Sequence, residues 1–203
     1  RSSAASDVYK RQAQWNLARL AESLLPLMDG ERENAIEMAE DALNAFEDIY
    51  KNKWLSMMGS KLGLHRADQK DEALVTELLN WMHQQKADYT NTFRDLSKPE
   101  LPSESAYITE SFQAWHTRWQ DRLGKEVQGW DSSVTLMDSV NPAVIPRNHK
   151  VEEALQAGEQ GDLNPFHNLL KALANPYQDG DHLTPFQATP EPSEKVYQTF
   201  CGT

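Results

Sequence analysis

The stretch 36–57, IEMAEDALNAFEDIYKNKWLSM, decides the fold of this chain. Apolar and aromatic side chains recur along it every three or four residues, which is the repeat of one face of an α-helix. This stripe consists of Ile36, Ala39, Leu43, Phe46, Tyr50, Trp54 and Met57. It extends over roughly six turns of helix, and Gly63 is a residue type that commonly ends one. We therefore expect one long helix whose stripe is buried in the core.

Shorter segments on both sides show the same helical spacing. The expected segments are Leu17 to Met28, closed by Asp29–Gly30; 74–82; a short helix capped by Asp88; 109–124; a helix capped by Asn148; and one opened by Asn164–Pro165. The long stripe should pack against Leu74, Leu78 and the helix that carries Trp115 and Trp119. No alternating pattern typical of strands occurs. The sequence predicts a mainly α fold.

Composition excludes several classes of partner. The chain has 203 residues, 31 of them acidic and 20 basic, for a formal net charge of −11. This length fits one domain or one large piece of a domain. The acidic balance argues against nucleic acid as a partner, because phosphate neutralisation requires clustered Lys and Arg. No apolar run approaches the roughly 20 residues of a membrane span, so no membrane contact is expected. The single cysteine, Cys201, fits a reducing compartment.

The chain divides into three segments by pattern. The first dozen residues lack both helical periodicity and the apolar core of a signal peptide, and resemble adapter read-through. We set residues 1–13 aside as a leader and expect the helical region to cover 14–180. After Asn175–Pro176 prolines are frequent, and we expect 181–203 to form an extended tail with an accessible thiol at Cys201.

The best polar candidates for a site follow Pro146. Arg147 offers fixed donors for a carboxylate or phosphate, and Asn148 would stand at a helix amino terminus that favours anions. The alternative, which we favour, is a structural salt bridge plus a cap. His149 lies three and four residues before Glu152 and Glu153. This spacing permits a metal-dependent hydrolase site, but a salt-bridged surface is the simpler interpretation.

Other candidates are interpreted as structural. His116 lies between Trp115 and Trp119 and is expected to be half-exposed beside these two core residues. Large side chains occur together at Trp54, Met57 and Met58. We expect them to lie in the core rather than around a ligand. The sequence contains neither a glycine-rich phosphate loop nor a Gly-x-Ser-x-Gly elbow.

Ordered motifs resemble one known family. They are QWNLARLA at 14–21, KLGL at 61–64, ADYTNTFRDL at 87–96, the segment from Asn141–Pro142 to Ala154, NPY at 175–177 and TFCGT at 199–203. From about residue 14 to the end, the chain is similar to the carboxyl-terminal half of the selenoprotein O (SelO) family. The resemblance implies a protein-kinase-like fold, or pseudokinase, that acts as a protein adenylyltransferase. Such an enzyme moves AMP from ATP, with Mg or Mn, onto Ser, Thr or Tyr hydroxyls of protein substrates.

The resemblance also implies that the catalytic residues lie outside this chain. The family's nucleotide-binding lysine and glutamate, its metal ligands and its catalytic aspartate precede the motif that holds Trp15. We therefore expect no catalytic, cofactor-binding or metal-binding residue here, and no activity without the missing amino-terminal region. The implied location is the cytoplasm of a bacterium, or the mitochondrion in a eukaryote. The alternative function is a free-standing acidic helical module that binds proteins.

One functional position carries over from the family, namely Cys201. In relatives the tail holds a selenocysteine or cysteine, which in bacterial forms pairs with a cysteine near the activation segment. The resemblance therefore implies a redox-regulated tail whose partner is absent here. A thiol titration of the native chain should count one fast-reacting group.

Overall fold

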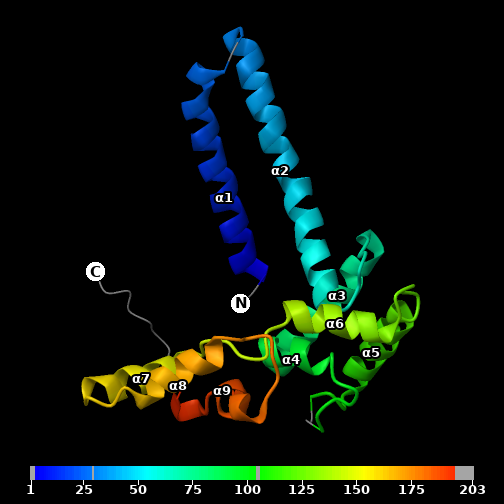
Figure 1. The fold of residues 1–203 in the computed structure, drawn as a ribbon. Coiled ribbons are helices and arrows are strands. Elements are labelled where there is room, and N and C mark those ends of the chain that lie inside the picture. Colours follow the sequence, from blue (N-terminus) through cyan, green and yellow to red (C-terminus); the bar gives the residue numbers. More distant parts are fainter. Residues whose placement is uncertain (1–2, 29, 104–105, 195–203) are drawn as a thin grey trace. The chain divides into compact units, whose positions relative to one another are not determined.

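The computed structural model of the chain describes residues 3–28, 30–103 and 106–194 (Figure 1). Within these ranges all regular structure is helical and no strand occurs, which confirms the mainly α prediction. The α-helices are α1 (Ser3–Leu24), α2 (Arg32–Lys61), α3 (Glu72–Gln85), α4 (Tyr89–Asp95), α5 (Glu110–Leu123), α6 (Trp130–Val140), α7 (Asn148–Glu159), α8 (Asn164–Leu173) and α9 (Thr184–Gln187). Short 3-10 helices lie at η1 (Leu25–Leu27), η2 (Gln69–Asp71), η3 (Asp181–Leu183) and η4 (Pro192–Glu194). None of the described helices has the combination of length and apolarity that crossing a membrane requires.

The chain forms two compact units, and the division between them falls at Met57 and Met58 inside α2. The first unit contains α1 and most of α2. In it, the Lys10 ammonium lies 2.7 Å from a carboxylate oxygen of Glu47 and 6.0 Å from the ring centroid of Tyr50. Helix α1 begins at Ser3, so residues 3–13, which we set aside for lack of periodicity, are helical. Their assignment to a leader stays a prediction.

The long helix is present, but its stripe is not the core. Helix α2 ends at Lys61, and Gly63 follows with φ +78, as the spacing predicts. None of the seven stripe residues is buried: Ile36 and Met57 are exposed and the five between them are half-buried. The prediction of a buried stripe is therefore wrong, as is core placement of Met57, whereas Met58 is buried. A helix covered on one side only keeps much of its apolar surface in water.

The core of the second unit is built on α3 and α5, which pack against each other. Leu78, Trp115 and Trp119 are almost fully buried there, as expected. Buried indoles need a partner for the N–H group. The Trp115 indole donates to the carbonyl of Leu74 at 2.8 Å, and the Trp119 indole donates to that of Leu62 at 3.0 Å. Two large rings are thereby buried without an unsatisfied donor.

The sequence did not predict two of the helical segments. Helix α6 is rich in Ser, Thr and Val, which favour a helix only weakly, yet its Met137 is fully buried. The segment after residue 180, expected to be extended, forms η3 and α9. Its Leu183 is buried against Val144 and Ala172, so tertiary packing overrides the proline-rich local sequence.

Candidate functional site

The guanidinium of Arg147 is bound by the residue that caps α4 and by a residue in the first turn of that helix. Its Nη1 donates to Asp88 Oδ2 at 2.8 Å, and its Nη2 donates to Asp88 Oδ1 at 3.0 Å and to Asn91 Oδ1 at 2.9 Å. Arg147 is buried, and this fork-to-fork pairing uses both of its terminal nitrogens. The geometry is that of the structural alternative, an ion pair, and leaves no terminal nitrogen for a free anion.

The cap of α7 differs by one residue from the expectation. Arg147 occupies the N-cap position and makes no side-chain capping bond, while Asn148 is the first helical residue. Asn148 is therefore not the cap. The next residue, His149, is buried at the start of the helix.

Asp88 serves two elements at once. It caps α4, as predicted, by accepting the backbone N–H of Asn91 at 2.8 Å, and it binds Arg147. Burial raises the pKa of the Asp88 carboxyl, but the hydrogen bonds from Arg147 and from the Asn91 amide outweigh burial and leave the pKa below its ordinary value. The carboxylate therefore favours the folded state.

Asp88→Asn should lower the free energy of unfolding at pH 7 by about 1–3 kcal/mol, because the charged fork around Arg147 is lost. A carboxyl group whose pKa is lower in the folded state stabilises the fold at pH values above its unfolded pKa of about 3.9. This contribution disappears as the pH falls through the pKa of the folded state. Denaturant titrations between pH 7 and pH 3.5 should show the difference from the unchanged protein shrinking. The exposed Asp121→Asn is the control. A penalty that is constant with pH would show that the charge of Asp88 is not its cause.

A second buried arginine, Arg94, was missed by the sequence analysis. It is 5% exposed, and its Nη1 donates to the carbonyl of Asn141 at 3.1 Å. The same nitrogen lies 2.9 Å from Asp138 Oδ1, while Nη2 donates to the carbonyl of Tyr177 at 3.3 Å and also binds the Asp179 carboxylate. Arg94 thus joins α4 to α6 and to the segment after α8. The available signal was its place between the apolar residues Phe93 and Leu96 of the expected short helix.

Lys61 and Asn141 bind each other reciprocally. The ammonium of Lys61 donates to Asn141 Oδ1 at 3.1 Å, and the Asn141 amide returns a bond of 2.9 Å to the Lys61 carbonyl. The ring centroids of Tyr89 and Phe93 lie 5.7 Å and 5.2 Å from the ammonium nitrogen of Lys61. Burial lowers the pKa of Lys61. This pair anchors the end of α2 to the end of α6.

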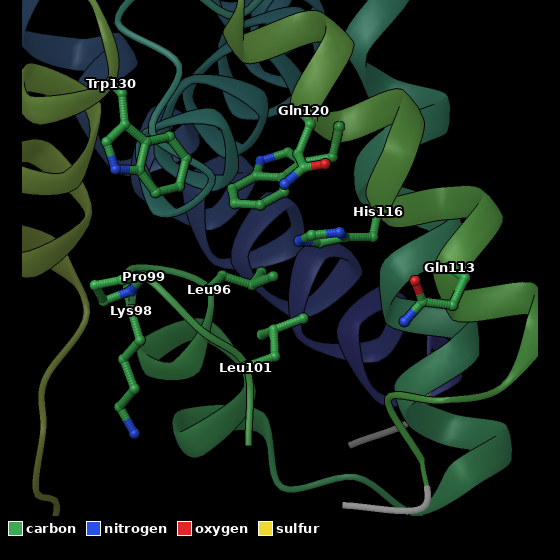
Figure 2. A pocket seen from close by; sticks show the side chains of 9 residues that line it. Leu96, Lys98, Pro99, Leu101, Gln113, His116, Gln120 and Trp130 are labelled. Carbon is green, nitrogen blue, oxygen red and sulfur yellow. The ribbon is translucent and has the colours of Figure 1, made fainter. Parts of the chain in front are cut away.

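A cavity of about 460 Å³ opens between α5, the start of α6 and the loop after α4 (Figure 2). Figure 2 shows the His116 ring pointing from α5 toward Leu96 and Leu101. His116 is half-buried beside Trp119, as expected, with ring centroids 5.2 Å apart, and burial lowers the pKa of its imidazole. The described lining residues combine apolar side chains with the polar ends of Lys98, Gln113, His116 and Gln120.

Several carboxylate and arginine side chains of the described residues are engaged with each other within the chain. No group of three or more His, Cys, Asp or Glu side chains among them could hold a metal ion, and this includes His149 with Glu152 and Glu153. Arg94, Arg122 and Arg147 each bind a carboxylate of this chain. Cys201 lies outside the described residues, and its redox role stays a prediction.

Comparison with known proteins decides the family. A family model described as protein adenylyltransferase SelO matches residues 7–174. The chain belongs to the SelO family. The resemblance of the ordered motifs is thereby confirmed, and the match begins within the segment that we set aside as a leader.

Several relatives carry the name protein nucleotidyltransferase YdiU. The one from Alcanivorax borkumensis is 50% identical over 191 residues, which cover 94% of this chain and 40% of the relative. That from Nitrosococcus oceani is 48% identical over 194 residues, or 95% of this chain and 39% of the relative. The relative from Pelagibacter ubique is 49% identical over 191 residues, with shares of 93% and 39%. This SelO chain spans about two fifths of the length of the curated relatives it matches.

Proposed function

We propose that this chain is the helical carboxyl-terminal part of a longer, kinase-like protein adenylyltransferase. The observation that carries the proposal is family membership combined with a match to only two fifths of each relative. In the reaction, a Ser, Thr or Tyr hydroxyl oxygen of a protein substrate attacks the α-phosphorus of ATP. A phosphodiester to AMP forms, pyrophosphate leaves and the hydroxyl proton passes to a base.

The chain's own residues support the enzyme rather than carry out this step. ATP with Mg or Mn would supply the transferred group and the charge neutralisation in the intact enzyme. The described residues do not fit these groups, because the buried arginines Arg94 and Arg147 are engaged by Asp179 and Asp88. We assign them to positioning: they fasten α4 to α6, to α7 and to the segment after α8.

The 203-residue chain should transfer no AMP. Incubation with labelled ATP, Mg or Mn and a generic protein substrate tests this, with the full-length A. borkumensis relative as the positive control. We expect label on protein only with the relative. Label above that of a heat-killed control with the 203-residue chain would contradict the proposal that the catalytic groups lie elsewhere, and an inactive relative would favour the interaction-module alternative.

A further inference from the structure

Helix α2 carries a second apolar stripe that the described chain leaves uncovered. It consists of Met38, Ala42, Ala45 and Ile49, spaced so that all four share one side of the helix. Met38 is 60% exposed and Ile49 is 56% exposed, and both alanines are exposed as well. At 100° per residue, this side lies about 110° from the half-buried stripe. We call these four residues the outer stripe.

The remaining side of α2 is acidic. Between residues 36 and 51 it is formed by Glu37, Glu40, Asp41, Asn44, Glu47, Asp48 and Lys51. The two apolar stripes together therefore occupy about half of the helix circumference. A helix that packs against one neighbour and is otherwise surrounded by water needs an apolar face narrower than half of its circumference. An uncovered second stripe indicates a further contact surface.

The other long helix of the first unit, α1, also has more apolar side chains than the described residues cover. Leu20 and Leu24, one turn apart on α1, are exposed, and Leu27 in η1 continues the row with 80% exposure. Trp15 is exposed on the same helix. Both α1 and α2 thus carry large apolar side chains that the described residues do not bury.

We propose that the outer stripe binds the part of the longer protein that this chain does not contain. This inference rests on the proposed function. The relatives are about two and a half times as long as the matched region, since that region makes up 40% of the relative. Permanent interfaces are more hydrophobic than transient ones, and this stripe is apolar. Each copy of this chain carries a formal net charge of −11, so like-charge repulsion disfavours the pairing of two copies through the stripe.

The test compares one substitution in two contexts, the 203-residue chain and a chimera in which this chain replaces the matched region of the A. borkumensis relative. In the chain alone, Met38→Glu and Ile49→Glu should change the melting temperature by less than about 2 °C, because both side chains already face water. In the chimera each should lower it by more than about 5 °C. Asn44→Glu, on the acidic side, is the matched control and should be neutral in both. A chimera that tolerates both apolar substitutions would overturn the proposal.

Binding in trans gives a second measurement that does not require the chimera to fold. Mixed with the remaining three fifths of the relative, the 203-residue chain should form a 1:1 complex by light scattering. Ile49→Glu should weaken this complex at least tenfold, whereas Asn44→Glu should not. A homodimer of the chain that Ile49→Glu dissociates would instead assign the stripe to a second copy. AMP transfer is measured separately: stripe-dependent melting in an inactive chimera would count against the proposed reaction, not against the interface.

Discussion

Replacing Arg94 with methionine should lower the free energy of unfolding by about 3–5 kcal/mol. The guanidinium donates to the carbonyls of Asp138, Asn141 and Tyr177, and methionine leaves these acceptors without their donor. The paired carboxylates contribute less to the loss, because the side chains of Asp138 and Asp179 are 37% and 64% exposed and remain hydrated. Chemical denaturation followed by circular dichroism measures the change.

Two further substitutions separate this explanation from a general effect of removing an arginine. Arg118 forms an exposed ion pair with Glu77, so Arg118→Met should cost less than about 1 kcal/mol. Arg94→Lys keeps the charge but loses the planar fork, and should recover only part of the stability. Equal losses of unfolding free energy for Arg94→Met and Arg118→Met would show that the buried network stabilises the fold no more than an exposed ion pair does.

Phe112→Ala should cost about 3–5 kcal/mol, whereas Phe46→Ala should cost less than about 1.5 kcal/mol. Phe112 is fully buried, and its ring centroid lies 4.6 Å from that of Trp81 and 5.6 Å from that of Trp115. Truncation therefore opens a cavity inside the second unit. Phe46 is half-buried, and its ring lies 6.1 Å from that of Tyr50.

Denaturant melts of both variants check this pair of expectations. Because the chain has two compact units, the melts should be followed by circular dichroism and tryptophan fluorescence together, so that separate transitions are detected. A larger loss for Phe46→Ala than for Phe112→Ala would restore the stripe Ile36 to Met57 as the core. Such a result would contradict the exposures observed along α2.

The sequence by itself determined the local features of this protein. Helical spacing predicted α2, α3 and α5, and Asp88 was recognised as the cap of α4 because a capping side chain bonds a backbone amide three residues away. The ordered motifs were sufficient to indicate the family, which the model match at residues 7–174 confirmed. The helices and the cap depend on neighbours within a few residues along the chain, and the family is indicated by the order of the motifs.

The tertiary structure alone decided which apolar faces are buried and which charges are paired. Periodicity shows that a face is apolar, but not what covers it, so the stripe of α2 and the indoles of α5 were expected to be equally buried. Asp179 is 85 residues from Arg94 and Asp88 is 59 residues from Arg147, and no local spacing encodes such pairs. Burial and long-range pairing depend on how the helices pack, and the segments that pack together are distant in the chain.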